Sequence, residues 1–72
     1  MLVMADAGEA AIELEKSLRD FSWFSFVGLA RVDDRDVLIV YLASKRALKD
    51  SRIPARWMGF EVQSRFVGPL VP

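Results

Sequence analysis

Apolar residues recur at helical spacing near the start of the chain. The segment 6–20, DAGEAAIELEKSLRD, begins with Asp6, and Glu9 follows three residues later, which is the spacing of a capping box. After this cap, apolar side chains recur every three or four residues at Ala7, Ala11, Leu14, Leu18 and Phe21. The spacing predicts a helix over residues 6–20 whose apolar stripe faces a core.

From residue 22 the pattern becomes typical of strands. Residues 22–32, SWFSFVGLARV, are rich in aromatic and branched side chains. Alternation predicts one face with Phe24, Phe26, Ala30 and Val32, and a second face with Trp23, Val27 and Leu29. Gly28 indicates a bulge, or a place where another backbone or an aromatic ring comes close. Residues 33–36, DDRD, predict a turn, and residues 37–43, VLIVYLA, predict a strand covered on both faces.

The second half of the chain predicts one short helix and one further strand. Residues 44–52, SKRALKDSR, form a helix capped by Ser44, with Ala47 and Leu48 facing inward. Residues 60–67, FEVQSRFV, alternate apolar and polar side chains, as expected of an edge or half-solvated strand. Between them, Pro54 ends the helix and Gly59 lets the backbone enter the strand.

These elements predict a small α+β domain spanning residues 1–72, in the order α-β-β-α-β. The sheet has three strands, and the N-terminal helix packs on one of its faces. Residues 1–4 and 68–72 are expected to be extended tails, since Pro69 and Pro72 lack the amide donors that a strand needs.

The first two predicted strands are apolar on both faces, and one helix covers only one face. Hydrophobic residues make up 53% of the chain and the formal net charge is zero, a balance that promotes association. We therefore expect a homo-oligomer that covers the second face with another copy of the chain. The expected contact residues are Trp23, Val27, Leu29, Leu70 and Val71.

Charge is distributed unevenly along the chain. Residues 1–20 carry five carboxylates against two cationic side chains, whereas residues 45–65 carry six cationic side chains against two carboxylates. The alternative function is therefore a module that binds an anionic partner, an acidic protein or, less favoured at zero net charge, nucleic acid. Segment 45–56 supplies the cations and the aromatic at its end supplies a stacking surface, through Arg46, Lys49, Arg52, Arg56 and Trp57.

Catalytic and metal chemistry are poorly represented. The chain has no histidine and no cysteine, so the commonest general base and metal ligand is missing and there is no thiolate. Adjacent side chains such as Ser44 and Lys45 diverge on a helix, and the aspartates of DDRD lack the pattern of a calcium loop. We expect neither an enzyme nor a cofactor or metal.

Residues 26–67 carry a run of short motifs: VGLARV, then VLIVYL, then Ile-Pro, then GFEV. In this order they resemble the small α/β module that precedes the catalytic domain of some bacterial trypsin-like serine peptidases. The resemblance implies a similar strand order. It transfers no catalytic residue, because the chain has neither histidine nor the Gly-x-Ser-x-Gly elbow.

No segment of the sequence suggests a membrane. The apolar start, MLVM, is followed by Asp6 and Glu9 and forms neither the charged nor the long apolar region of a signal peptide. The longest apolar run, VLIVYLA, has seven residues, far short of the roughly 20 that a spanning helix needs. We expect a cytoplasmic protein with no membrane partner.

Overall fold

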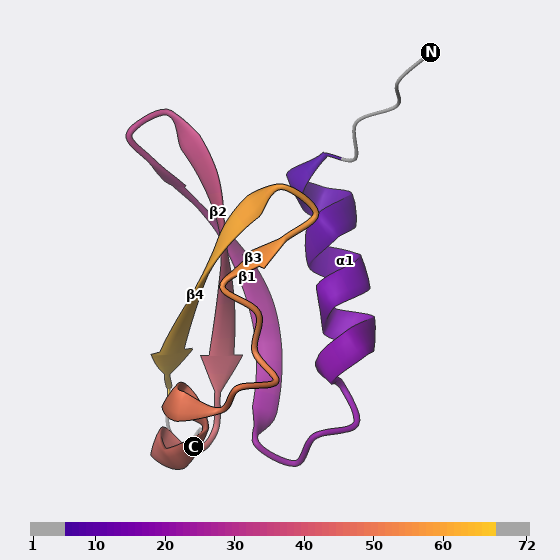
Figure 1. The fold of residues 1–72 in the computed structure, drawn as a ribbon, viewed down its shortest axis with the longest axis vertical. Helices are drawn as coiled ribbons and strands as arrows, with labels where there is room; N and C mark the ends of the chain where they lie inside the picture. Colours follow the sequence, from indigo (N-terminus) through magenta and orange to yellow (C-terminus); the bar gives the residue numbers. More distant parts are fainter. Residues whose placement is uncertain (1–5, 68–72) are drawn as a thin grey trace, which may run out of the picture.

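The computed structural model describes residues 6–67, and places one helix beside a mixed β-sheet (Figure 1). Helix α1 spans Ala7–Leu18, and the Asp6 carboxylate accepts the backbone N–H of Glu9 at 2.8 Å. The predicted cap is thereby confirmed. No helix in residues 6–67 is both long and apolar enough to cross a membrane.

The sheet contains four strands in the order β1-β2-β4-β3. Strand β1 spans Phe24–Val32, β2 spans Arg35–Leu42, β3 spans Arg56–Trp57 and β4 spans Phe60–Phe66. Strands β1 and β2 form an antiparallel hairpin, β4 returns parallel to β2, and β3 pairs antiparallel with β4. The parallel pair requires a crossover, which the segment between Ala43 and Ala55 provides.

The predicted three-stranded sheet and α-β-β-α-β order are wrong in two details. The first is β3, which has two residues and is too short to leave a periodic pattern in the sequence. The second is segment 44–52, where a 3₁₀ helix, η1, spans Lys45–Lys49 and Ser44 makes no side-chain cap. Only Ala47 of η1 is buried, while Leu48 is exposed, so little apolar burial holds this segment in a longer α-helix.

Two short turns close the hairpins. Asp33 and Asp34 join β1 to β2 with φ angles of 51° and 63°, and Met58 and Gly59 join β3 to β4 with φ angles of 50° and 89°. Positive φ at both central residues is the mark of a type I′ turn, whose twist matches that of the flanking strands. The predicted turn over residues 33–36 is therefore confirmed at its first two positions, and Arg35 and Asp36 belong to β2.

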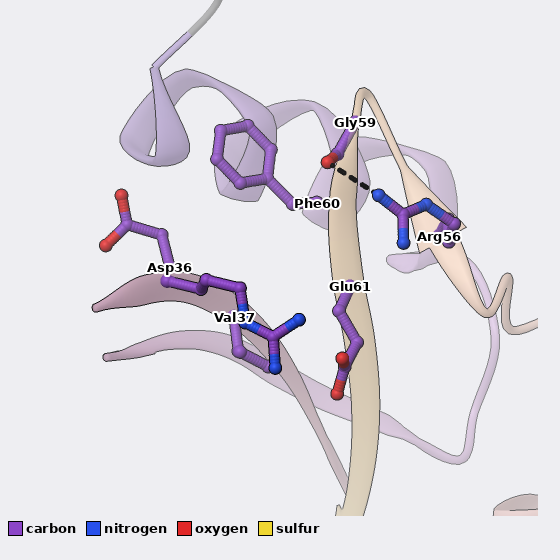
Figure 2. A pocket seen from close by; sticks show the side chains of 7 residues that line it. Asp36, Val37, Arg56, Gly59, Phe60 and Glu61 are labelled. Carbon is purple, nitrogen blue, oxygen red and sulfur yellow. Dashed lines mark hydrogen bonds between the residues drawn. The ribbon is translucent and has the colours of Figure 1, made fainter. Parts of the chain in front are cut away.

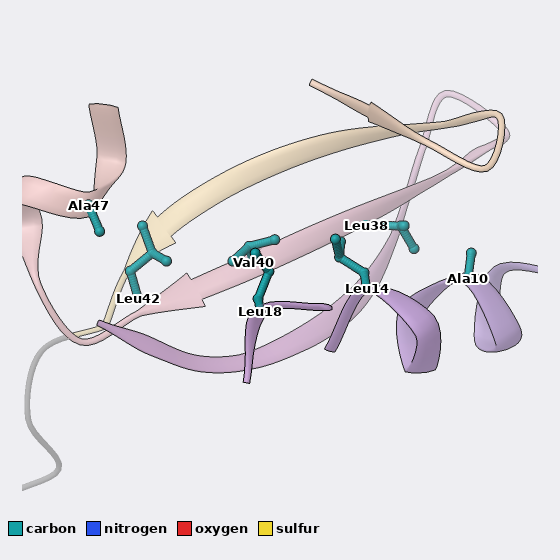
Figure 3. Close-up of a cluster of buried hydrophobic side chains, with 7 residues drawn as sticks. All are labelled: Ala10, Leu14, Leu18, Leu38, Val40, Leu42 and Ala47. Atoms are coloured by element: carbon teal, nitrogen blue, oxygen red, sulfur yellow. The ribbon is translucent and has the colours of Figure 1, made fainter. Parts of the chain in front are cut away.

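The core lies on one side of the sheet (Figure 3). Leu14 and Leu18 of α1 meet alternate residues of β2, and all of these side chains are at most 1% exposed. Ala47 of η1 joins the same cluster, so the helix and the crossover cover the same sheet face. The fully buried cluster comprises Ala10, Leu14, Leu18, Leu38, Val40, Leu42 and Ala47.

Candidate interaction surfaces

The side of the sheet opposite α1 and η1, named here the bare face, is defined by the strand register. Tyr41 and Ile39 of β2 alternate with the core residues Leu38, Val40 and Leu42, so they point away from α1. The partners of β2 in β1 and β4 share this orientation. The bare face comprises Phe26, Gly28, Ala30 and Val32 of β1, Arg35, Val37, Ile39 and Tyr41 of β2, and Glu61, Gln63 and Arg65 of β4.

Two aromatic side chains stack on the bare face, one from β1 and one from β2. The rings of Phe26 and Tyr41, opposite each other in the register, stack at 4.4 Å with an interplanar angle of 20°. Tyr41 also leans over Gly28, where an added Cβ would lie 2.8 Å from its Cε2 atom. The prediction that an aromatic ring approaches Gly28 is therefore confirmed. Glycine is required here because any side chain would displace the Tyr41 ring.

Exposed apolar surface concentrates along β1 and not at the centre of the bare face. Val37 and Ile39 of β2 are 2% and 5% exposed, flanked across the sheet by the hydrogen-bonded pair Gln63 and Glu61. On β1 the exposed fractions are 45%, 53% and 42% for Phe26, Leu29 and Val32. The solvent-exposed apolar residues of β1 are thus spread over both of its faces.

The structure places the residues predicted to form an oligomer interface in different environments. Trp23 and Val27 are half-buried against the core cluster on the α1 side, so their assignment to an uncovered face is wrong. Leu29 is exposed, although it also belongs to the α1 side because it lies opposite Leu38. Leu70 and Val71 lie outside the described residues.

A bulge explains the error in the predicted faces. The β1–β2 register shifts between Phe24 and Phe26, so these two residues, which simple alternation places together, lie on opposite faces. Phe24 pairs with Leu42 and packs against the core, whereas Phe26 pairs with Tyr41 on the bare face. The residues that sequence reasoning missed as candidates are therefore Phe26 and Val32. Their apolar character was visible, but the bulge was not.

Arg52, one of the predicted anion-binding residues, is occupied within the chain. Its guanidinium donates to both carboxylate oxygens of Asp50, at 2.9 and 2.6 Å, and its backbone N–H donates to the same carboxylate at 2.8 Å. The guanidinium also lies 4.3 Å from the ring centre of Phe21, which stacks on Trp23. These contacts tie the crossover to the end of α1 and leave Arg52 with fewer donors for a partner.

The same contacts change the ionisation of the pair. The side-chain hydrogen bond from Arg52, aided by its backbone N–H and its positive charge, lowers the pKa of Asp50 from 3.8 to about 2. The reciprocal hydrogen bond raises the pKa of Arg52. Both groups are therefore charged at neutral pH.

The remaining predicted anion-binding residues fall into two places. Arg46 and Lys49 are exposed on η1, and no ion pair to either is formed within residues 6–67. Arg56 lies at the start of β3 and donates to the Gly59 carbonyl at 3.1 Å. Trp57 is half-buried against the core cluster, so it packs at the corner and does not offer a free stacking face.

A cavity of about 250 Å³ opens where β2, β3 and β4 begin (Figure 2). It mixes charges of both signs around apolar side chains, with Arg35, Arg56, Asp36 and Glu61 beside Val37, Gly59 and Phe60. Glu61 already accepts a hydrogen bond from Gln63, and Arg56 already donates to Gly59. Because its formal charges balance, the cavity suits a small zwitterion better than a polyanion. Within the described part of the chain, no cluster of three or more potential ligands could hold a metal ion.

Comparisons of the chain with protein-family models, with curated proteins and with solved structures gave no significant match. The resemblance to the module that precedes some serine peptidases therefore stays a prediction. What the chain does has to be argued from its surfaces.

Proposed function

We propose that this chain is a non-enzymatic interaction protein that assembles with further copies of itself through the apolar surface along β1. The observation that carries the proposal is the exposure of Phe26, Leu29 and Val32 on one edge strand. Phe26 and Val32 lie on the bare face and Leu29 lies on the α1 side, so this edge strand presents large apolar side chains on both faces, which a partner added at the edge can cover.

The expected assembly is weak. Full burial of a large apolar side chain contributes about 1.5–3 kcal/mol, and roughly half of each of the three side chains remains to be buried, which gives about 2–4 kcal/mol per chain. Two chains contribute twice this amount, against an association cost of at least about 4 kcal/mol. The balance leaves at most about 4 kcal/mol, which corresponds to a dissociation constant of about 1 mM or weaker, so the test has to reach millimolar concentration.

Sedimentation velocity over a concentration range from micromolar to a few millimolar tests the proposal. We expect a monomer–dimer equilibrium for the unchanged chain and a shift to monomer for Phe26→Ser. Ile12→Ser is the matched control, because Ile12 is 53% exposed but lies on α1, away from β1. A monomer at every concentration for the unchanged chain, or equal dimerisation of both variants, would contradict the proposal.

A second candidate is binding of an anionic partner through η1. The exposed side chains of Arg46 and Lys49 support it, with Lys45 beside them near the ring of Phe66. Binding of a polyanion such as heparin or a DNA duplex would then weaken steeply with salt. Arg46→Glu combined with Lys49→Glu should abolish the binding, while Arg19→Glu, at the residue that caps the C-terminus of α1, should leave it nearly unchanged. Absence of retention on heparin at low salt would remove this candidate.

A further inference from the structure

Resting on the proposed self-assembly, we propose that two copies join by antiparallel pairing of their β1 strands, so that two four-stranded sheets become one sheet of eight strands. The strand order places β1 at the sheet edge with β2 as its neighbour on one side. Nine residues with one charge, Arg31, and no proline or lysine form this edge. From Phe26 to Val32, beyond the bulge, Arg31 is the one feature of this strand that usually discourages pairing with another chain.

The β1–β2 hairpin determines which amides of β1 face outward. In a hairpin closed by a two-residue turn, the flanking residues exchange both backbone hydrogen bonds, so Val32 and Arg35 form a bonded pair. Bonded pairs alternate along an antiparallel ladder, so Gly28 and Ala30 also bond to β2. The N–H and C=O groups of Val27, Leu29 and Arg31 therefore point away from β2 and are free to pair with a partner.

A register centred on Gly28 pairs the outward groups of Val27 and Leu29 and fits the side chains. With Gly28 on the two-fold axis, Val27 lies opposite the partner's Leu29, and both have outward amides that can exchange hydrogen bonds. On the bare face, the large Phe26 lies opposite the partner's small Ala30. A large side chain opposite a small one packs without a clash. The two-fold axis repeats this contact, because each chain supplies one Phe26 and one Ala30.

The separation of like charges and the burial of exposed apolar side chains also favour this register. Centring on Gly28 places the two copies of Arg31 six residues apart along the new pair, about 20 Å, so they do not repel at close range. The bulge between Phe24 and Phe26 ends regular pairing on one side. Helix α1 packs on the same side of β1 as Leu29, yet Leu29 is 53% exposed, so the helix leaves this side chain uncovered. A partner strand paired with β1 lies beside both Leu29 and Phe26. It therefore covers part of each side chain, although the two lie on opposite faces of the sheet.

Leu29→Pro tests the pairing directly. Proline removes the amide of Leu29, which faces outward, and leaves the ladder to β2 intact. We expect Leu29→Pro to sediment as a monomer at concentrations where Leu29→Ala, the matched control that keeps the amide, still dimerises. Dimerisation of Leu29→Pro equal to that of Leu29→Ala would overturn strand pairing. If Phe26→Ser still dissociated in that case, the proposed self-assembly would stand with a different geometry.

Amide hydrogen exchange on the unchanged chain keeps the inference testable if Leu29→Pro fails to fold. The amides of Gly28 and Ala30, bonded to β2, should be protected at every concentration and serve as the internal control. The amides of Val27 and Leu29 should gain at least tenfold protection between the monomer and the dimer. Unchanged exchange at Val27 and Leu29 across the dimerisation range would overturn the strand pairing without affecting the sedimentation result.

Discussion

The two edges of the sheet are protected to different degrees. At one edge, β3 pairs with the start of β4, and the Val62 amide donates to the Ala55 carbonyl at 2.9 Å. Beyond that point β4 carries Gln63 and Arg65 on its bare face. At the other edge, β1 runs for nine residues with no neighbouring strand among the described residues, and exposes apolar side chains on both faces. One edge is partly covered by a two-residue strand, whereas the other is a nine-residue strand that pairs on one side only.

The difference shows why exposure has to be judged strand by strand. The bare face has no helix over it, yet Val37 and Ile39 at its centre are buried by their neighbours in the same chain. The most exposed large apolar side chains of the four strands are Phe26, Leu29 and Val32 of β1, and Phe66 of β4 is also exposed. A small domain can therefore leave one face of its sheet without a second layer, provided that its side chains bury each other there.

The largest predicted effect separates β1 from the strand beside it. Leu38 and Leu29 lie opposite each other in the register, but their exposed fractions are 0% and 53%. Leu38→Ala should lower the free energy of unfolding by about 2–5 kcal/mol because it leaves a cavity in the core. Leu29→Ala should change it by about 0.5 kcal/mol or less. Urea denaturation of the monomer measures both, and similar losses would show that β1 is buried as deeply as β2.

The next effect concerns the aromatic pair that supports β1. Gly28→Ala places a methyl group 2.8 Å from Tyr41 Cε2, so the ring has to move and its stacking on Phe26 is lost. We expect a loss of about 1–3 kcal/mol in the free energy of unfolding. The double variant Gly28→Ala with Tyr41→Ala should lose less than the two single losses combined, because the clash is absent. Additive losses would show that the ring does not constrain position 28.

A smaller effect, of opposite sign, is expected at the protected edge. Met58 has a φ of 50°, which costs a residue with a Cβ about 1–2 kcal/mol relative to glycine. Because glycine also loses more entropy on folding, Met58→Gly should raise the free energy of unfolding by about 0.5–1 kcal/mol. Met58→Val, with a branched side chain, should lower it. Thermal denaturation of both variants measures the difference, and a destabilised Met58→Gly would contradict the assigned turn.

The smallest effect is the pH dependence of the Asp50–Arg52 pair. The folded state lowers the pKa of Asp50 from 3.8 to about 2, so the pair stabilises the fold above pH 3.8 and loses this contribution as the pH falls to about 2. Asp50→Asn should therefore reduce stability at neutral pH, and its difference from the unchanged chain should shrink between pH 4 and pH 2. Urea midpoints at several pH values measure it. A constant difference would show that the ion pair does not matter.

Local features of the sequence predicted the local structure well. The Asp6 cap, the helix that follows it, the Asp33–Asp34 turn and the close approach at Gly28 each depend on neighbouring residues or on one residue's conformational freedom. Strand β3 and the bulge near Ser25 were missed. A two-residue strand forms only because β4 offers it a partner, and a bulge is set by the fit of Phe24 to the core.

The sequence by itself determined that α1 and two apolar strands exist, that apolar residues exceed what one helix covers, and that the chain has no histidine and no cysteine. Tertiary structure alone decided where the excess apolar surface lies. Side-chain alternation has a period of two, so a single bulge moves Phe26 from the face of Phe24 to the opposite face. Burial depends on the neighbours that the register supplies, which is why Val37 and Ile39 of β2 are buried, whereas Phe26, Leu29 and Val32 of the edge strand β1 are exposed.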